Sequence, residues 1–148
     1  MTKSSTLILM ALMITACGTE LDLKAVATGI KESVSIYNVL WQWESTVTPV
    51  EKIMVQNPER YTVLFSEEGK VSMQFDCNRG GGDFTVSKNR LSFGPLMSTR
   101  MACPEGSLDS VFMKDLQQVA SFFTKDGKLY LELPMDSGTM CFRPAGRE

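Results

Sequence analysis

The most constraining feature of the sequence is an alternating run that leads into a cysteine and then into three consecutive glycines. Residues 71–75, Val-Ser-Met-Gln-Phe, place apolar side chains at every second position, as expected for a strand. Residues 76–83, Asp-Cys-Asn-Arg-Gly-Gly-Gly-Asp, predict a tight turn or bulge, because glycine and asparagine adopt positive φ readily. A phosphate-binding loop would need a helix after the glycines, and residues 84–86 predict a second strand instead.

Other short alternating runs predict further strands, at residues 35–45, 61–65, 90–94, 129–133 and 138–142. A glycine late in the linker 66–70 indicates a hairpin between residues 61–65 and the strand at 71–75. Residues 47–58, with two prolines, are interpreted as a connection. Alternation places Trp41 and Trp43 on one face of the first strand, which favours core packing over a ligand platform.

One amphipathic helix is predicted, from Leu108 to Phe123. Its apolar residues recur at the spacing of a single helical face: Leu108, Phe112, Leu116, Val119 and Phe123. The stripe is interpreted as core-facing, because a membrane-surface helix would carry a more basic polar face. Several short strands and one helix predict an α+β fold class, with a small, strongly curved antiparallel β-sheet (a partial barrel) packed with one main α-helix.

Composition narrows the function classes. The chain has 148 residues, a formal charge of -2 and no histidine. Nucleic-acid binding is not expected, because it needs a concentrated basic face. The commonest general base and the commonest zinc ligand are missing, so Ser92, Ser98 and Ser107 have no histidine partner. The sequence predicts a non-enzymatic protein with no catalytic residues, no metal and no cofactor.

Residues 1–16 predict an export signal. Lys3 supplies a positive charge, and residues 7–14 supply an apolar core far shorter than the roughly 20 residues that span a bilayer. The signal ends in residues 14–18, Ile-Thr-Ala-Cys-Gly, which resemble the lipobox of bacterial lipoproteins. The resemblance implies cleavage before Cys17 and lipidation of its thiol. The alternative is ordinary cleavage after Ala16, which leaves Cys17 unmodified.

Several acyl chains would anchor the protein stably, because one chain alone binds a membrane only marginally. Gly18 is not the aspartate that typically retains lipoproteins in an inner membrane. By resemblance, we expect the protein in the bacterial cell envelope, lipid-anchored to the outer membrane and facing the periplasm. Residues 17–35 form the predicted lipidated tether, residues 36–144 the predicted domain and residues 145–148 a C-terminal tail.

Five sequence motifs and the helix occur in a specific order. The motifs are Leu-Trp at 40–41, Asp-Cys-Asn-Arg-Gly-Gly-Gly-Asp-Phe at 76–84, Leu-Ser-Phe-Gly-Pro-Leu at 91–96, Ser-Thr-Arg-Met-Ala-Cys at 98–103 and Gly-Lys-Leu-Tyr-Leu at 127–131. Together they resemble the META/HslJ-like domain of bacterial envelope lipoproteins. One departure is Phe75-Asp76 before Cys77-Asn78, where many members carry a small residue.

The resemblance implies a compact β-rich fold with one helix and no common enzyme activity. Members are associated with stress tolerance, motility or secretion-related roles. The candidate binding loop in this chain comprises Asp76, Asn78, Arg79, Asp83 and Arg100. For Arg79, a surface ion pair with Asp76 or Asp83 is expected in preference to an anion contact.

Three cysteines follow Cys17, and an oxidising compartment allows one disulfide among them, in three pairings. In line with the resemblance, we predict Cys77–Cys103, since each cysteine ends its motif at a loop beside the expected sheet. Cys141 lies on the last predicted strand and is expected to be a buried free thiol. A zinc site of three thiolates is the alternative, although the chain has no Cys-x-x-Cys spacing.

Three functions from different classes follow. The first is a monomeric envelope module that binds a protein, a lipid or a small apolar ligand in stress tolerance or envelope maintenance. This function predicts an apolar groove between helix and sheet, flanked by Trp41, Trp43 or Tyr61. The second is an inhibitor of an envelope-targeting hydrolase, similar to membrane-bound lysozyme inhibitors, with residues 79–83 as its exposed loop. The third is a structural tether with one stable partner.

Overall fold

The computed structural model describes residues 34–146. The predicted signal peptide, the lipidation of Cys17 and most of the predicted tether lie outside the described residues. Among residues 34–146, no helix is long and apolar enough to cross a membrane. The predicted domain can therefore be compared with the structure, and the predicted anchor cannot.

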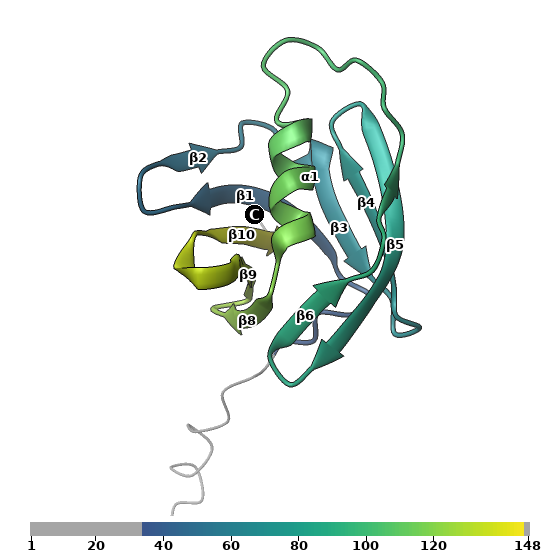
Figure 1. Cartoon of the computed structure of the whole chain (residues 1–148), viewed down its shortest axis with the longest axis vertical. Coiled ribbons are helices and arrows are strands. Elements are labelled where there is room, and N and C mark those ends of the chain that lie inside the picture. The colour runs from purple at the N-terminus through teal and green to yellow at the C-terminus, as the bar shows by residue number, and fades with distance from the viewer. Residues whose placement is uncertain (1–33, 147–148) are drawn as a thin grey trace, which may run out of the picture. The chain divides into compact units, whose positions relative to one another are not determined.

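Within residues 34–146, ten strands, one α-helix and two short 3-10 helices make up the fold (Figure 1). The strands are β1 (Leu40–Val47), β2 (Lys52–Met54), β3 (Tyr61–Phe65), β4 (Lys70–Phe75), β5 (Asn78–Ser87), β6 (Arg90–Phe93), β7 (Met97–Ser98), β8 (Ser121–Lys125), β9 (Lys128–Glu132) and β10 (Thr139–Pro144). The helix α1 spans Asp109–Gln118, and the 3-10 helices are η3 (Pro58–Arg60) and η4 (Pro134–Asp136).

The sheet closes on itself. The strands follow the order β10-β9-β8-β6-β5-β4-β3-β1-β2, and β1 also pairs with β10, so eight of the ten strands form a closed antiparallel barrel. The closing pair runs from Trp41 opposite Pro144 to Val47 opposite Thr139. Outside the ring, β2 pairs with β1 and β7 pairs with β5. The predicted curved antiparallel sheet with one helix is confirmed, and the barrel is complete rather than partial.

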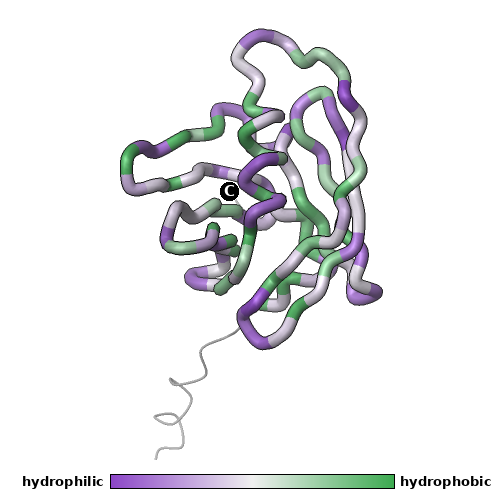
Figure 2. The backbone as a smooth tube through the Cα atoms, in the orientation of Figure 1, coloured by the Kyte–Doolittle hydropathy of each residue, from purple (hydrophilic) through white to green (hydrophobic). Residues whose placement is uncertain are grey.

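Aromatic side chains from several strands fill the barrel around one residue of α1. Trp41 and Trp43 are fully buried, which confirms their core packing, and Phe112 and Leu116 of α1 are also fully buried. The Phe112 ring centroid lies 5.8 Å from that of Phe75. It also lies 5.4 Å from Trp43, 6.0 Å from Tyr61 and 6.4 Å from Phe142. Phe112 thus packs among aromatic rings of β1, β3, β4 and β10, and it attaches α1 to the core together with Leu116. The outward face of α1, toward the viewer in Figure 2, carries hydrophilic residues.

The predicted hairpin is confirmed, with β3 at the predicted residues and β4 one residue longer. Gly69 in its turn has φ 76°, a left-handed conformation that favours glycine. The other predicted strands all occur, with boundaries that differ by a few residues at most, except that β1 begins later and β5 begins earlier than predicted. Strand β2 lies inside residues 47–58, which were predicted to be a connection, and β7 was not predicted.

The predicted glycine turn is wrong, because residues 80–82 lie inside β5. The turn is made by Asp76 and Cys77, and Asp76 has φ 60°. A Cβ on Gly80 would lie 2.6 Å from the carbonyl oxygen of Met97, and one on Gly81 would lie 2.8 Å from that of Val71. The glycines therefore allow neighbouring backbone to approach β5 closely, and positive φ plays no part.

The predicted helix begins one residue too early and extends five residues too far at its C-terminal end. It ends at Gln118, since Val119 adopts φ -52° and ψ 131°, which is extended. Residues 121–125 form β8 instead, and β8 pairs antiparallel with β9 along its whole length. Phe123, predicted to face the core, is 40% exposed and stacks on Tyr130 with ring centroids 4.6 Å apart.

Candidate functional site

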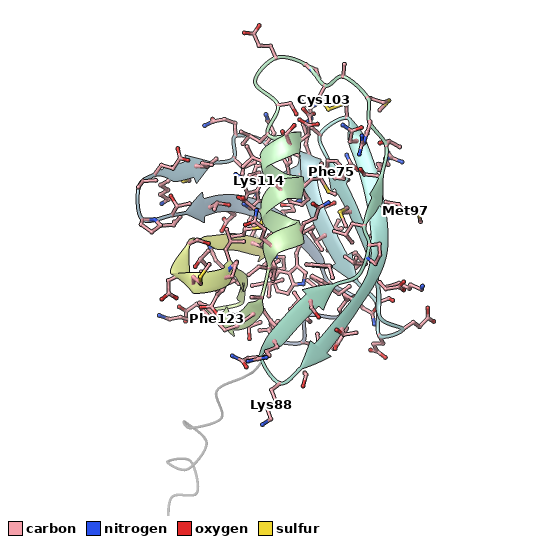
Figure 3. The ribbon with its side chains drawn as sticks, in the orientation of Figure 1. Phe75, Lys88, Met97, Cys103, Lys114 and Phe123 are labelled. Atoms are coloured by element: carbon pink, nitrogen blue, oxygen red, sulfur yellow. A yellow bond between two sulfur atoms is a disulfide. The ribbon has the colours of Figure 1, made fainter. Side chains whose placement is uncertain are left out.

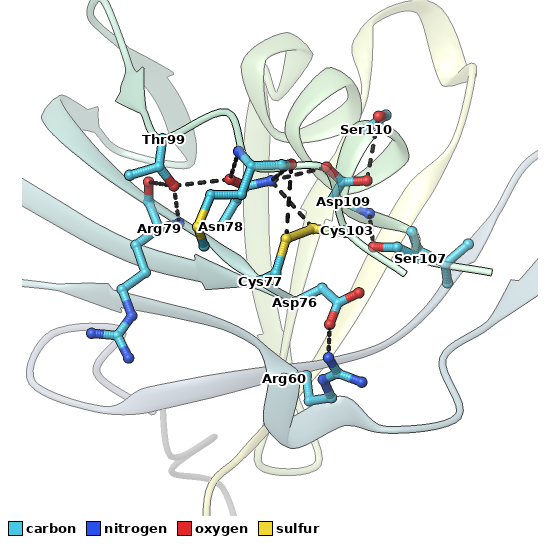
Figure 4. Close-up of a disulfide and its surroundings, with 12 residues drawn as sticks. Arg60, Asp76, Cys77, Asn78, Arg79, Thr99, Cys103, Ser107, Asp109 and Ser110 are labelled. Carbon is cyan, nitrogen blue, oxygen red and sulfur yellow. Dashed lines mark hydrogen bonds and ion pairs between the residues drawn. A yellow bond between two sulfur atoms is a disulfide. The ribbon is translucent and has the colours of Figure 1, made fainter. Parts of the chain in front are cut away.

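The segment that connects β7 to α1, residues 99–108, has no helix or strand and is joined to the start of β5. We call it the crossing segment; in Figure 1 it is the long loop that arches from beside β5 to α1. A disulfide links Cys103 of the crossing segment to Cys77, which confirms the predicted pairing (Figure 4). With these two cysteines bonded to each other, the alternative of three thiolates around zinc is not formed.

Asn78 is the second attachment of the crossing segment, and its residue is only 2% exposed. Its Oδ1 accepts hydrogen bonds from the backbone N–H of Met101, at 2.8 Å, and from the Thr99 hydroxyl, at 2.9 Å. Its Nδ2 lies 3.1 Å from Asp109 Oδ2 and 3.3 Å from Cys103 Sγ. The amide of one buried residue thus positions both the crossing segment and the first turn of α1 (Figure 4).

Asp76 and Asp83 are both paired, but not with Arg79. The Asp76 carboxylate is buried and forms an ion pair with Arg60, while the backbone N–H of Asp76 donates to the Arg60 carbonyl at 2.7 Å. The carboxylate of Asp83 lies 2.5 Å from Lys70 Nζ. The expected surface pair of Arg79 with Asp76 or Asp83 is therefore wrong, because other cations hold both carboxylates.

The five residues predicted as a binding loop do not lie on one loop. Asp76 and Asn78 are buried in the turn and at the start of β5, where they hold the structure together. Arg79 and Asp83 are exposed on β5, and Arg100 is exposed on the crossing segment. Because residues 79–83 belong to a strand of the barrel wall, the inhibitor hypothesis loses the protruding loop on which it depended.

A groove lies between α1 and the crossing segment. We call it the α1 groove; its volume is about 500 Å³. Its apolar lining includes Phe75, Met101 and Met113, and its polar lining includes Asn78, Arg100 and Asp109. Figure 3 shows Phe75 beside α1 and Cys103 near the end of α1 that the crossing segment enters. Sites for small ligands commonly have volumes of roughly 300–1,000 Å³.

An apolar groove beside the helix was predicted, but the residues that line it differ from the predicted ones. Trp41 and Trp43, predicted to flank it, are fully buried in the core. Tyr61 lines a separate and smaller pocket of about 220 Å³, where its hydroxyl accepts a hydrogen bond from the backbone N–H of Leu108 at 2.9 Å. Of the two acids that line that pocket, Asp76 and Glu105, Asp76 is already paired with Arg60. Because the α1 groove is also more than twice as large, it is the better candidate site.

Sequence reasoning missed Met101 and Met113 as site residues. A signal for Met113 was available, because Asp109, Met113 and Gln117 repeat every four residues and so share one face of α1. No comparable signal existed for Met101, since its position depends on the contacts of the crossing segment with Asn78.

Cys141 lies away from this groove, on the outer face of β10. It is a free thiol, as predicted, but it is only half-buried, because the neighbouring Met140 and Phe142 take the inward positions. Its Sγ lies 3.6 Å from Glu44 Oε2, and Glu44 also pairs with Lys128 Nζ at 2.6 Å. Burial first, and then the Glu44 carboxylate, raise the pKa of the Cys141 thiol.

These observations define a class of protein: a small closed antiparallel barrel with one helix packed on its core and a disulfide-linked segment leading into that helix. The META domain family matches residues 37–145, and the chain belongs to this family. The predicted family resemblance is confirmed. No curated protein matches the sequence of the chain.

Three solved structures share the fold. A protein from Burkholderia xenovorans, determined by NMR, is similar with a TM-score of 0.63 and 22% identity, over 76% of this chain and 85% of that one. A DUF4847 family protein from Bacteroides vulgatus has a TM-score of 0.59 and 8% identity, over 76% and 96% of the two chains. A further NMR structure has a TM-score of 0.57 and 24% identity, over 74% and 92%.

Proposed function

We propose that this protein is a non-enzymatic, lipid-anchored binding module of the bacterial cell envelope, and that its ligand occupies the α1 groove. The ligand is a lipid, a small apolar molecule or an apolar part of an envelope protein. The observation that carries this proposal is the groove itself, about 500 Å³ in volume and lined by Phe75, Met101 and Met113. Methionine side chains are flexible and polarisable, so they adapt to apolar partners of varied shape.

Two further observations support a surface groove as the site. The barrel interior is occupied by large side chains, including Trp41, Trp43 and Phe112, so its centre is packed core. Arg100 lines the groove and is exposed, and among residues 34–146 it has no ion pair. Its guanidinium can therefore bind a carboxylate or phosphate on an amphiphilic ligand.

The anchor in this proposal is Cys17, lipidated after cleavage of residues 1–16. The domain then faces the periplasm from the outer membrane, as a monomer that acts in stress tolerance or envelope maintenance. The Cys77–Cys103 disulfide supports an oxidising compartment, where such bonds persist. Metabolic labelling of cells with a fatty acid tests the anchor directly: we expect label on the wild-type chain and none on Cys17→Ser.

Native mass spectrometry of residues 18–148, purified from the periplasm of an expression host, tests the binding function. We expect a retained mass, and we expect Met113→Lys to lose it, because the substitution places a charge in the apolar lining. Gln118→Lys is the matched control, since Gln118 is exposed on α1 and does not line the groove. A bare wild-type domain, or a mass that Met113→Lys retains, would contradict the proposal.

A further inference from the structure

The crossing segment forms one wall of the α1 groove and has few attachments to the barrel. At its start, the backbone N–H of Thr99 donates to the Arg79 carbonyl at 2.9 Å, directly after the short β7 pairing. At its end, Leu108 donates to the Tyr61 hydroxyl. Between these points, the attachments to the barrel within the described residues are the Asn78 side chain and the Cys77–Cys103 disulfide.

This disulfide links the crossing segment, which lies at the surface, to the barrel. It does not link two parts of the core. Both cysteines are half-buried, so a thiol can reach the bond. The barrel closes independently of it, through the pairing of β1 with β10. Loss of the disulfide therefore leaves the Asn78 side chain as the attachment of the middle of the crossing segment, and it leaves the closed sheet in place.

We propose that the Cys77–Cys103 disulfide is a redox latch for the α1 groove: its reduction by a dithiol frees the crossing segment, opens the groove wall and lowers retention of the ligand. This inference rests on the proposed function, because it treats the groove as the binding site. A dithiol, as found in thiol–disulfide oxidoreductases, is the reductant that the step requires.

The step balances as ordinary thiol–disulfide exchange. A thiolate of the dithiol attacks one of the two sulfurs, the Cys77–Cys103 bond breaks, and a mixed disulfide forms while the other cysteine leaves as a thiolate. The second thiol of the reductant then attacks the mixed disulfide. Cys77 and Cys103 end as two thiols, having gained two electrons and two protons, and the dithiol ends as a disulfide.

Hydrogen exchange of the full chain in phospholipid nanodiscs, measured by mass spectrometry with and without dithiothreitol, tests the latch. We expect exchange in peptides covering residues 99–108 to rise by about tenfold or more on reduction, because loop closure no longer restrains them. Peptides from β3 and β4 should keep their protection. Unchanged exchange at residues 99–108, or an equal rise throughout the barrel, would overturn the latch.

Two variants serve as controls. Cys141→Ser removes the only other cysteine among residues 34–146 and should respond to dithiothreitol as the wild type does. The double variant Cys77→Ser with Cys103→Ser should show the fast exchange at residues 99–108 without reductant, and no response to it. A slow-exchanging double variant would contradict the latch even if the wild type responds.

A photoreactive fatty acid separates this inference from the proposed function. Its cross-links should map to peptides containing Met101 or Met113 in the oxidised protein, and reduction should weaken them about fivefold or more as the local structure opens. Absence of cross-links there in both redox states would contradict a fatty acid as the groove ligand, while hydrogen exchange would still decide the latch. Equal cross-linking in both states would overturn the latch alone.

Discussion

Gly80 shows how one missing side chain shapes the barrel wall. Its position in β5 brings a hypothetical Cβ within 2.6 Å of the Met97 carbonyl oxygen, and backbone cannot move aside as a flexible side chain can. We expect Gly80→Ala to destabilise the fold by about 2 kcal/mol through overpacking. Urea denaturation monitored by tryptophan fluorescence would measure the loss.

Gly94→Ala is the matched control for this prediction. A Cβ at Gly94 would lie 3.6 Å from Asp83, an ordinary contact, and Gly94 does not have a positive φ. We expect its effect on the free energy of unfolding to stay within about 0.5 kcal/mol. Equal effects of the two substitutions would show that close approach is not the reason for glycine in β5.

Asp115 on α1 provides a prediction about pH. Burial raises the pKa of its carboxyl, and the Lys114 ammonium only partly offsets this effect. Because the folded pKa lies above the unfolded one, the stability that Asp115 contributes is greatest at low pH and is lost as pH rises through the folded pKa. We expect Asp115→Asn to raise Tm at pH 7 and to lose that advantage at pH values below the carboxyl range.

Thermal unfolding at neutral and acid pH checks this expectation. Asp126→Asn, in the exposed turn between β8 and β9, is the control and should change Tm little at either pH. An Asp115→Asn variant that is less stable than wild type at pH 7 would reverse the sign and contradict the argument.

At the scale of elements, Phe112 is the larger of the two fully buried side chains that attach α1 to the core, the other being Leu116. Phe112 is fully buried and its ring meets aromatic rings of four strands, whereas Lys114 two residues later is exposed. We expect Phe112→Ala to lower the free energy of unfolding by about 4 kcal/mol, and Lys114→Ala to lower it by less than about 0.5 kcal/mol. Chemical denaturation of the two variants measures the difference; a small loss for Phe112→Ala would show that α1 docks by other contacts.

The boundary between α1 and β8 shows why the sequence predicted some elements and not others. Leu108 to Leu116 follow helical spacing, and this part formed a helix because the pattern is local. Val119 and Phe123 continue the same spacing, but residues 121–125 pair with β9 along their whole length. A pairing partner several residues further along the chain is invisible to a periodicity count, so the extension was wrong.

The candidate site was predictable only in part, for a similar reason. The disulfide pairing could be predicted because both cysteines end recognisable motifs, and Trp41 and Trp43 could be assigned to the core from alternation alone. The prediction of a turn at residues 80–82 was wrong because glycine suits two situations, a positive φ and a close approach of neighbouring backbone, and the sequence does not distinguish them. The prediction placed the groove beside the wrong residues, because Met101 comes to line the same groove as Met113 through the contacts of the crossing segment with Asn78.

At the scale of the whole molecule, the last strand completes the barrel. In β10, Met140 and Phe142 are fully buried, and the strand pairs with both β1 and β9. We expect removal of residues 139–148 to abolish cooperative unfolding, because β1 and β9 would both lose a partner and the core would open to water. Circular dichroism in the near ultraviolet, followed during heating, would detect the loss.

Cys141→Ser is the control, since it changes β10 at an outward position and keeps its pairing. This variant should unfold in one cooperative transition, as the wild type does. A truncated chain that still unfolds cooperatively would show that β10 is dispensable for the fold.

The pairing of β1 with β10 also sets when the protein can become folded. Residues 41–47 pair with residues 139–144, so the barrel cannot close before β10 has been synthesised. Until then β1 and β9 each lack this partner strand, and backbone groups that β10 would pair remain unpaired. Closure of the barrel is therefore a late, non-local step of folding, and pairings of this kind are slow to form.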